Sequence, residues 1–588
     1  MSKPRPKRFW ADLKDLVRLW PFLKAHKKTL ILSSCLIPVI SVLQMSVPFI
    51  LKRTIDQGVL KGDFHVLTLG ALAYLIVVIV EYCVRAVQTV LTSRAVFQMI
   101  RDMRMSLIDH IMRLSARYHD KNLSGALVTR ATSDFDNLSE SLNQGVLSSV
   151  VDLAVLTGAV VGLFLLDWHL ALITLCVLPF VLLTINLFSK ALKQSMLLAR
   201  VKIAALNAYT QECLYGVNTV KVLSGHKDSE QKFDKLTLEY RDAQMKSVVA
   251  DAVLFSLLDG IASITIGLVL WFTVRPSAET FLSAGIMIAF VQYVQNLFDP
   301  LKQLANKIAM LQGAFTAIDR VFSIFDTHEF IGGDGPAEIL MGKVEFVDVS
   351  FAYNPPTPTL QNLNFAIPSG DSLALVGTTG SGKSTIIKLL SKLYTGYEGE
   401  ILIDDQPLNA MDGVALRRKI AIVPQDIVIF KGSVSFNIGL GEPEITQAMI
   451  EEAAKYVEAD RFIQKLPGAY NYQLREGGDD ISVGQRQLIA FARAIARNPK
   501  IIILDEATSS VDPASDAIIQ KAIEKLFTGR TLIVIAHRLS TIRRCDSIAV
   551  LEKGRILETG AHDELIRKQG KYYSLHEKLL HDDPDALA

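Results

Sequence analysis

Hydrophobic residues gather in six long stretches within the first half of the chain. They are centred near residues 29–51, 66–88, 145–166, 168–189, 251–274 and 280–298. Each is long enough to cross about 30 Å of hydrocarbon as a helix, so the pattern predicts six membrane-spanning helices. The connections after the second and fourth stretches are long and rich in Arg and Lys, whereas those after the third and fifth are short. Because positively charged connections stay cytoplasmic, both termini and the two long connections are expected inside.

The two long connections keep helical periodicity instead of loop composition. Met99, Met103 and Leu107 repeat at helical spacing, which predicts that the membrane helices continue into the cytosol. Each connection contains one break, around His119–Ser124 and around Tyr215–Asn218. A short crossing helix at each break would be placed to contact the next domain; a plain helical hairpin turn is the alternative that the local sequence leaves open.

An apolar stripe precedes the first stretch. Within residues 9–24 it is formed by Trp10, Leu13, Val17, Trp20 and Leu23. This spacing predicts an amphipathic helix, which would lie along the inner membrane surface or pack on protein. The basic N-terminus is followed by no apolar run until about Lys28 and by no small-residue cleavage site, so we expect no cleaved signal.

The pattern of hydrophobic and polar residues changes after the sixth stretch. The helical pattern runs to about Phe325, GGDGP at 332–336 interrupts it, and strand-like alternation begins at Val344. Alternating strand-like and helix-like segments with glycine-rich turns follow, as in α/β domains. The predicted ranges are an elbow helix over 1–27, a membrane domain over 28–327, a linker over 328–342, an α/β domain over 343–582 and a tail over 583–588.

Composition supports a membrane protein and argues against two other classes. Half of the 588 residues are hydrophobic and only 21% are charged, which is low for a soluble enzyme of this size. The net charge of +2, without a long basic run outside the N-terminal arm, argues against nucleic acid as a partner. The five cysteines are scattered, without a CxxC pair, which argues against a disulfide framework and a zinc site.

The most specific chemical signal is the segment LALVGTTGSGKSTIIKLL. Residues 377–384 fit GxxxxGK[ST] between a strand and a helix, the pattern of a phosphate-binding loop. Its glycines Gly377, Gly380 and Gly382 would let backbone amides wrap a phosphate. Lys383 would contact the β- and γ-phosphates of ATP, and the Ser384 hydroxyl would be a ligand of Mg²⁺.

A second signal is KIIILDEATSSVD, in which four apolar residues end in Asp505 and Glu506. The apolar run predicts a buried parallel strand. At its end Asp505 could hold the Mg²⁺ shell, and Glu506 could act as the general base that polarises water against the γ-phosphate.

Between these two segments lies GGDDISVGQRQLIAFARAIARNPK. With these residues the chain resembles the ABC transporter family over nearly its whole length, and ISVGQ at 481–485 stands where the family has a signature of the LSGGQ type. The resemblance implies the type I ABC exporter fold. This fold is an α-helical membrane domain of six spans fused to an α/β phosphate-loop NTPase domain, here in a bacterial inner membrane with the NTPase domain cytoplasmic.

The resemblance also implies roles for further residues. Tyr353 would stack on adenine, Gln425 would join the Mg²⁺ site to the membrane domain and assist catalysis, and His537 would contact the γ-phosphate beside the catalytic Glu506. Glu476 would lie in the segment that touches the crossing helices, and SSVD at 509–512 would connect two nucleotide domains. The implied ATP-binding residues are Tyr353, Gly377, Thr378, Thr379, Gly380, Ser381, Gly382, Lys383, Ser384, Thr385, Ser482, Gly484 and Gln485, and the implied Mg²⁺ residues are Ser384, Gln425 and Asp505.

In the family two nucleotide domains pair head to tail, so that ATP lies between one chain's phosphate loop and the other chain's signature. A second half-transporter is therefore an expected partner. Val483 stands where the family usually has glycine, which favours a heterodimer with one weaker ATP site, while a homodimer is the alternative. The intact Lys383, Asp505, Glu506 and His537 favour a pump over an ATP-gated regulatory membrane protein.

Charged residues inside the predicted spans bear on the identity of the substrate. Such charges are energetically costly in a membrane and often mark a transport pathway. Glu81 and Arg85 are spaced as an i,i+4 ion pair. Asp152 and Asp259 would face a cavity and favour cationic amphiphiles, and the sixth span offers Gln292, Gln295 and Asn296. We expect export of a small amphipathic substrate from the bilayer, a drug, lipid or peptide; a lipid flippase is one alternative.

Overall fold

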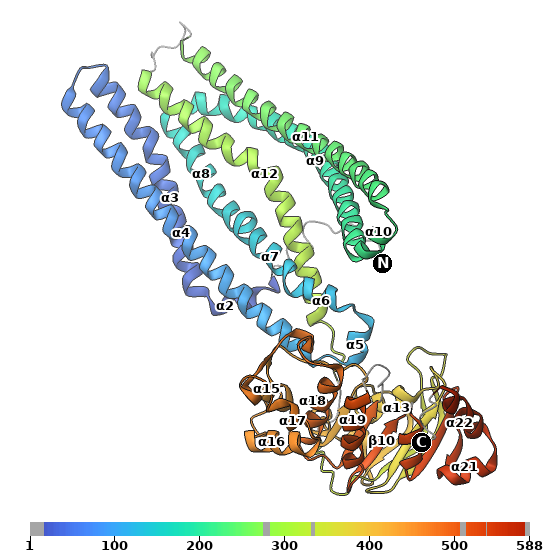
Figure 1. Ribbon diagram of the computed structural model, residues 1–588. Coiled ribbons are helices and arrows are strands. Elements are labelled where there is room, and N and C mark those ends of the chain that lie inside the picture. The colour runs from blue at the N-terminus through green and yellow to red at the C-terminus, as the bar shows by residue number, and fades with distance from the viewer. Residues whose placement is uncertain (1–16, 275–282, 331–334, 506–512, 537, 583–588) are drawn as a thin grey trace. The chain divides into compact units, whose positions relative to one another are not determined.

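The computed structural model describes residues 17–274, 283–330, 335–505, 513–536 and 538–582 (Figure 1). The chain forms two compact units. The first comprises residues 1–112 and 124–327, and the second comprises residues 113–123 and 328–588. A short piece from the helical half of the sequence, residues 113–123, thus belongs to the second unit.

The first unit is built from very long helices. In chain order its helical segments are α2 (Trp20–Ala25), α3 (Lys27–Arg53), η1 (Thr54–Val59), α4 (Phe64–Arg113), α6 (Ser124–Ala131), α7 (Ser133–Glu140), η2 (Ser141–Leu147), α8 (Ser148–Leu166), α9 (Trp168–Tyr215), α10 (Val217–Val222), α11 (His226–Val274) and α12 (Ala284–Phe325). A helix of 50 residues such as α4 is about 75 Å long, more than twice the hydrocarbon thickness. Such a helix is long enough to continue beyond the membrane, as the sequence predicts.

By length and composition, the described residues account for five of the six predicted spans. Among the described residues, five helical segments are long and apolar enough to cross a membrane, and they contain the first five predicted stretches. From residue 284 on, the sixth stretch lies in α12, a helix of 42 residues. Its membrane half carries Gln292, Gln295 and Asn296, and these polar side chains lower its hydropathy.

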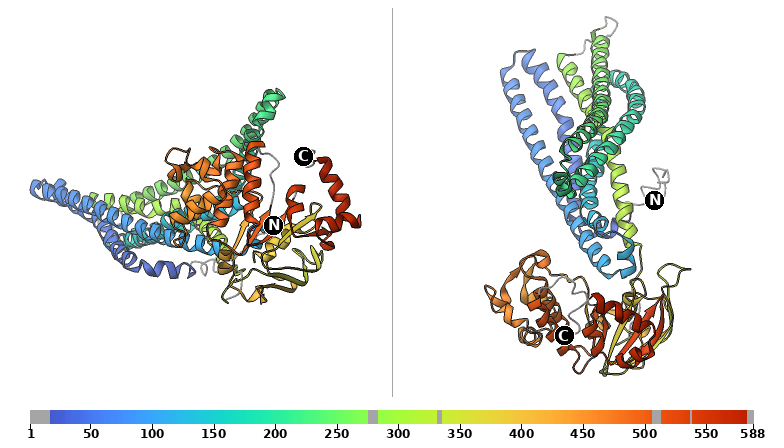
Figure 2. Two further views of the ribbon diagram at one scale, coloured as in Figure 1. Left: turned by 60° about the horizontal axis from the view of Figure 1, so that its bottom comes forward. Right: turned by 45° about the vertical axis from the view of Figure 1, so that its right-hand side comes forward.

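Helices of the first unit pack in pairs and around α12. α9 and α11 pack along their length and are joined by α10, while α12 packs on α3, α8 and α11 (Figure 1). α3 and α4 lie side by side in Figure 1 and in the right-hand view of Figure 2. A Cβ on Gly162 would stand 2.5 Å from Tyr293, so the small residue on α8 lets the buried ring of α12 approach closely.

Both breaks predicted in the long connections are present. The first connection bends at α5 (Ala116–Lys121), and the second bends at Gly216 before α10. The predicted elbow helix lies mostly outside the described residues. Of its stripe, Trp20 is 60% exposed, whereas the neighbouring Leu19 is buried, and Arg18 forms an ion pair with Asp326 at the end of α12 at 2.6 Å. The described part therefore packs on protein through one side only.

The second unit contains two large sheets. A four-stranded antiparallel sheet has the order β2-β1-β4-β5 and a six-stranded sheet has the order β12-β11-β3-β10-β9-β6; in the latter all neighbours are parallel except β11 and β12. Their strands are β1 (Val344–Phe351), β2 (Leu360–Ile367), β3 (Ser372–Gly377), β4 (Glu398–Ile403), β5 (Gln406–Pro407), β6 (Ile420–Val423), β9 (Ile501–Asp505), β10 (Thr531–Ile535), β11 (Ser547–Glu552) and β12 (Arg555–Gly560). A small pair, β7 (Gly432–Ser433) and β8 (Gln473–Leu474), lies outside them.

Helices cover these sheets and form a lobe beside them. They are α13 (Lys383–Leu390), η3 (Leu408–Ala410), α14 (Gly413–Lys419), α15 (Val434–Gly439), α16 (Gln447–Tyr456), α17 (Asp460–Ile463), η4 (Ala469–Asn471), η5 (Glu476–Gly478), α18 (Val483–Ile495), α19 (Pro513–Leu526), α20 (Leu539–Arg544), α21 (His562–Lys568) and α22 (Lys571–Asp582). In the right-hand view of Figure 2 the orange helices α15–α18 form the lobe.

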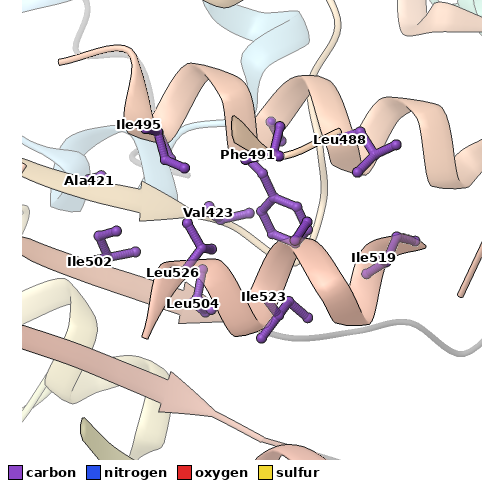
Figure 3. Packing of buried hydrophobic residues seen from close by; sticks show 14 of the residues in the cluster. Ala421, Val423, Leu488, Phe491, Ile495, Ile502, Leu504, Ile519, Ile523 and Leu526 are labelled. Carbon is purple, nitrogen blue, oxygen red and sulfur yellow. The ribbon is translucent and has the colours of Figure 1, made fainter. Parts of the chain in front are cut away.

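Alternate residues of the parallel strands serve two cores. Ile501 and Ile503 of β9 face the core shared with the antiparallel sheet, whereas Ile502 and Leu504 face the core under α18 and α19. In Figure 3, Phe491 of α18 lies against the side chains of α19 and the strands. A strand buried on both faces needs an unbroken apolar run, which confirms the prediction of a buried parallel strand before Asp505.

Candidate nucleotide site

The candidate site lies where parallel strands of the six-stranded sheet end. β9 pairs with β10 so that Asp505 stands opposite Ile535, and β10 pairs with β3 so that Ile535 stands opposite Leu375, two residues before Gly377. On the other side Val423 of β6 stands opposite Leu504. Because the carboxyl ends of parallel strands share one edge, segments distant in the sequence meet there.

The loop after β3 has the backbone of a phosphate cradle. Gly380 and Gly382 have φ of 80° and 107°, values that residues with a Cβ rarely adopt. A Cβ on Gly377 would stand 2.3 Å from the carbonyl oxygen of Leu551. Thr378, Thr379 and Gly380 are exposed, while Ser381 and Lys383 are buried, so the loop is open on one side and rooted in the core on the other.

Polar groups at the base of the loop suit an anionic ligand. The Lys383 ammonium donates hydrogen bonds to the carbonyl oxygens of Gly377 at 2.7 Å and Thr378 at 3.1 Å. Burial lowers its pKa, and the nearby Asp505 carboxylate opposes that shift. Ser381 is 2% exposed, and its hydroxyl oxygen has no partner among the described residues. A buried cation and an unpaired hydroxyl are the groups that a phosphate would satisfy.

Tyr353 lies within an aromatic cluster next to the loop helix. Its hydroxyl donates a hydrogen bond to the Thr385 hydroxyl at 3.2 Å. Its ring packs edge-on against Phe351 and Tyr394, with ring centroids 5.0 Å and 4.9 Å apart. The ring is only partly buried, which leaves a face for a planar partner such as adenine.

A group that the sequence analysis missed joins this cluster to the crossing helix α5. The Tyr394 hydroxyl is hydrogen-bonded to the Asp120 carboxylate, and the Lys388 ammonium lies 3.5 Å from the same carboxylate. Arg117 donates to the carbonyl oxygen of Tyr353 at 3.4 Å. Burial, and secondarily the Asp120 carboxylate, raises the pKa of Tyr394. Only the fold brings residue 120 to residue 394, and neither lies in a recognisable motif.

The implied Mg²⁺ residues sit at the same edge of the sheet. Gln425 and Asp505 line one small cavity of about 30 Å³, and Asp505 is close enough to Lys383 to raise the pKa of that lysine against the effect of burial. No group of three or more His, Cys, Asp or Glu side chains in the described ranges could hold a metal alone. One carboxylate and one hydroxyl fit Mg²⁺, which takes most of its oxygens from water and from the phosphates of its nucleotide.

The signature segment begins helix α18. The Ser482 hydroxyl accepts a hydrogen bond from the Gln485 amide at 3.2 Å, and the Gln485 side chain accepts one from the Ser482 amide at 3.0 Å. This capping box fixes the helix start. Val483 is 40% exposed and does not have a positive φ, so its Cβ strains nothing within this chain. Any effect of the missing glycine would fall on a ligand that approaches from outside, while Gly484 is buried beneath.

Three predicted elements lie outside the described residues: Glu506, the SSVD segment at 509–512, and His537. Chain connectivity alone places Glu506 directly after β9 and His537 two residues after β10. Glu476, which is described, starts the short helix η5 and is exposed.

In the membrane unit Asp152 lines a cavity, as predicted, but the expectation that the charges of Asp152 and Asp259 are available to a cationic substrate is corrected. Asp152 forms an ion pair with Lys307, and Asp259 forms one with Lys302 at 2.6 Å. Neither acid is therefore a free negative charge, because a lysine on α12 neutralises each. The predicted Glu81–Arg85 pair is confirmed at 2.6 Å, and Arg85 also donates to Gln44 at 3.1 Å.

Comparison with known families agrees with this division of the chain. The family model of the ABC transporter transmembrane region matches residues 30–301, and the ABC transporter model, which describes the ATP-binding domain, matches residues 360–509. The second match includes the phosphate loop, the signature and Asp505.

Curated relatives and a solved structure match over nearly the whole chain. The ATP-dependent lipid A-core flippase of Escherichia coli is 33% identical, covering 95% of this chain and 97% of the relative. The "Probable multidrug resistance ABC transporter ATP-binding/permease protein YheH" of Bacillus subtilis is 35% identical, covering 82% and 72%. A bacterial Atm1-family ABC exporter, solved with ATP bound, superposes with a TM-score of 0.78 at 25% identity, covering 94% and 98%. The chain belongs to the ABC transporter family: it is a multi-pass membrane exporter whose helical transmembrane domain is fused to an ATPase domain that couples ATP hydrolysis to transport.

Proposed function

We propose that this chain is one half of a dimeric exporter that moves small amphipathic molecules, drugs, lipids or peptides, across the bacterial inner membrane. The observation that carries the proposal is a cavity of about 1030 Å³ in the membrane unit. The cavity walls come from α4, α7, η2, α8 and α12, while the outer faces of the helices expose apolar side chains such as Leu72, Leu75 and Ile79. A space of this size accepts a drug-sized molecule or a lipid headgroup.

The nucleotide chemistry proposed for the second unit uses residues of both chains of a dimer. Lys383 and the loop amides would bind the β- and γ-phosphates, Tyr353 would stack on adenine, and Ser384, Gln425 and Asp505 would hold Mg²⁺. Mg²⁺ would supply charge neutralisation on the phosphates. Glu506 would orient and deprotonate water, with His537 near the γ-phosphate. Ser482, Gly484 and Gln485 would contact the nucleotide held by the partner's loop.

Exposed apolar residues at the second crossing segment support a partner subunit. Leu214, Tyr215, Val222 and Leu223 are 69%, 85%, 82% and 74% exposed. These side chains lie at the cytosolic tip of α9, α10 and α11, away from lipid, and a patch of this kind marks a protein interface. We propose that the patch docks on the nucleotide domain of a second half-transporter.

We further propose that the partner is a different chain. Val483 is exposed at the start of α18, so its side chain would stand where the partner's ATP approaches and would weaken one of two sites. If the purified chain alone gave full substrate-stimulated ATP hydrolysis, the heterodimer would be wrong and a homodimer would replace it.

The test of the proposed function is Glu506→Gln in proteoliposomes, with any required partner present. We expect loss of both ATP hydrolysis and ATP-dependent movement of a fluorescent amphiphile, while ATP binding remains. Removal of a general base costs about 10²–10⁴-fold in rate. Unchanged hydrolysis together with unchanged transport would contradict the proposal.

A further inference from the structure

The large cavity of the membrane unit is lined mainly by hydrogen-bonding side chains. On the α4 wall these include Gln88, Thr89 and Thr92, and α12 contributes Gln303. Phe97, Leu147, Val151 and Met310 are its apolar members. Gln88, Thr89 and Thr92 are already hydrogen-bonded within the chain. Among the described residues, the groups of this wall that still need a partner from a ligand are therefore the unpaired ones at Ser139 and Asn143.

Most charges on the cavity wall are already neutralised within the chain. Arg85 pairs with Glu81 at 2.6 Å, and Asp136 pairs with Arg104 at 3.0 Å. Asp152 and Lys307 pair with each other across the cavity wall. These pairs leave the wall without a free cation among the described lining residues, so it offers no counter-charge to an anionic ligand.

Glu140 is the exception on this wall. It is exposed at the end of α7 and lines the cavity. No ion pair or hydrogen bond of its side chain is found within the described ranges. Glu140 also lines a second cavity, which carries Lys193, Arg200 and Arg320. On the side of the first cavity the other wall charges are paired, and a carboxylate on a concave wall attracts a cation more effectively than one on an open surface, because the surrounding protein excludes part of the screening water.

Two unpaired polar atoms lie next to Glu140 in the sequence and on the same wall. Ser139 is 5% exposed, and its hydroxyl oxygen has no hydrogen-bond partner in the described part of the chain. The amide oxygen of Asn143 is also buried and without a partner there. Both residues line the cavity. A buried polar atom without a partner is costly, and acceptors beside a carboxylate are complementary to an N–H donor that carries positive charge.

We propose that this cavity recognises a protonated amine on a hydrogen-bonding headgroup, with Glu140 as the counter-charge and Ser139 and Asn143 as hydrogen-bond partners. The inference rests on the proposed function, whose substrate class it narrows. It moves the recognition of a cation from Asp152 and Asp259, which are paired, to Glu140. The amine belongs either to a lipid headgroup or to a soluble solute, since both present the same chemistry to the wall.

The direct test is equilibrium binding without ATP, using the full-length chain in nanodiscs with any required partner. The probes are two fluorescent single-chain amphiphiles with the same dye and chain, one ending in a primary amine and the other in a hydroxyl. We expect the amine probe to bind about ten-fold more tightly, which corresponds to one charge-assisted contact. In Glu140→Gln this preference should disappear, and in Glu140→Asp most of it should remain.

Two further variants distinguish a loss of amine recognition from a nonspecific effect of substitution on the protein. Glu230→Gln removes an equally exposed acid on α11 that does not line the cavity, and it should keep the full preference. Ser139→Ala should weaken the amine probe by about three-fold, the effect of one hydrogen bond, with little change for the hydroxyl probe. If wild type shows no amine preference, or if Glu140→Gln keeps it, the inference is overturned.

Transport assays then identify the source of the amine. They also distinguish a failure of the amine-headgroup inference from a failure of the proposed exporter function. In inside-out vesicles we compare ATP-dependent uptake of a soluble amine dye with ATP-dependent transfer of fluorescent phosphatidylethanolamine between leaflets. A preference for either over its hydroxyl analogue supports the amine headgroup and names its source. ATP-dependent transport of both amine and hydroxyl compounds without preference overturns the headgroup inference alone. Absence of any difference between wild type and Glu506→Gln would instead contradict the proposed function.

Discussion

The Tyr394 hydroxyl and the Asp120 carboxylate form a hydrogen bond. This bond links the segment that follows α13, the helix after the phosphate loop, to the crossing helix α5. The ring of the same tyrosine packs edge-on against Tyr353 at 4.9 Å. One side chain thus touches both the proposed adenine-stacking ring and a helix that continues the chain of α4. A change in the position of Tyr353 on nucleotide binding would therefore be transmitted through Tyr394 to α5.

This relationship predicts separate effects on binding and on coupling. Tyr394→Phe keeps the ring contacts but removes the hydrogen bond to Asp120. We expect ATP affinity within about two-fold of wild type, because the loop is untouched, and a several-fold loss of substrate-stimulated ATP hydrolysis. Nucleotide binding by fluorescence and steady-state ATPase assays measure the two quantities.

Tyr397→Phe is the matched control. The Tyr397 hydroxyl has no hydrogen-bond partner among the described residues, and burial raises its pKa to about 12. Removing it should leave substrate stimulation intact. Equal stimulation in the two phenylalanine variants would show that the Tyr394–Asp120 bond has no part in coupling.

Two glycines of the phosphate loop should respond differently to alanine. In Gly377→Ala the new Cβ meets the Leu551 carbonyl oxygen at 2.3 Å, so strand β3 or β11 must shift. We expect a loss of about 1–3 kcal/mol in stability, and ATP binding should be abolished. In Gly380→Ala the new Cβ meets no atom of the described residues within 4 Å, although φ is 80°. That backbone strain costs about 1–2 kcal/mol, and weak binding should survive. Thermal unfolding of the full chain in detergent and ATP binding give the comparison; an equal loss of ATP binding in both would refute the steric explanation.

Asp404 should anchor the entry into β1. Its carboxylate accepts hydrogen bonds from the amides of residues 340, 341, 342 and 343. Burial opposes ionisation, but these amides together lower its pKa. Asp404→Asn keeps a residue type that tolerates the positive φ of 48° and should cost about 1–3 kcal/mol by weakening the amide contacts.

The neighbouring Asp405→Asn serves as the control for Asp404. Asp405 also has positive φ, 64°, but its side chain is 76% exposed and forms a surface ion pair with Lys343, so we expect Asp405→Asn to cost less than about 1 kcal/mol. Because the pKa of Asp404 is lowered in the fold, its stabilisation is present above the unfolded value of 3.8 and is lost as pH falls through the folded pKa. Melting temperatures of both variants between neutral and acid pH test this; indistinguishable curves would speak against the anchor.

The Asp152–Lys307 pair should behave as a coupled unit within the membrane domain. Lys307 is 9% exposed, so Asp152→Asn leaves a nearly buried lysine without its partner, and Lys307→Met leaves an unpaired carboxylate. Each single change should cost roughly 1–3 kcal/mol, while the double variant should cost less than their sum. Melting temperatures in detergent of the four proteins form the double-mutant cycle. Strict additivity would mean that the two charges do not interact.

A pair of histidines near the C-terminus should make the second unit sensitive to mild acid. The His562 Nδ1 lies 2.8 Å from the hydroxyl of the buried Tyr572, and the His562 and His576 rings are 5.5 Å apart. Burial first, and then the charge of Arg543, lowers the pKa of both histidines from the ordinary value of 6.5. Because the folded state binds protons more weakly than the unfolded state, stability is complete above about pH 6.5 and falls as pH drops through the folded pKa.

Replacement of both histidines by glutamine should flatten this part of the stability curve. The measurement is the melting temperature of wild type and of the double variant between about pH 7.5 and about pH 5.5, a range that brackets the titration of a histidine. A parallel fall in both proteins would assign the acid sensitivity to other groups.

Elements set by local pattern were predictable from the sequence. The apolar lengths predicted the membrane helices, and the strand-glycine-helix order around Lys383 predicted the phosphate loop, because chain neighbours alone determine these features. The apolar run before Asp505 predicted a doubly buried strand for the same reason. The first part of the elbow helix and the roles of Glu506 and His537 stay predictions, since these residues lie outside the described ranges.

Only the tertiary structure decided which distant side chains meet. It paired Asp152 with Lys307 and Asp259 with Lys302, joined Asp120 to Tyr394, and left Glu140 on a cavity wall. The sequence by itself determined the elements and the chemistry carried by contiguous motifs, because helical and strand periods are properties of neighbouring residues. Whether a charge is free or neutralised depends on packing between helices that are distant in the sequence, and no local pattern records which helices meet.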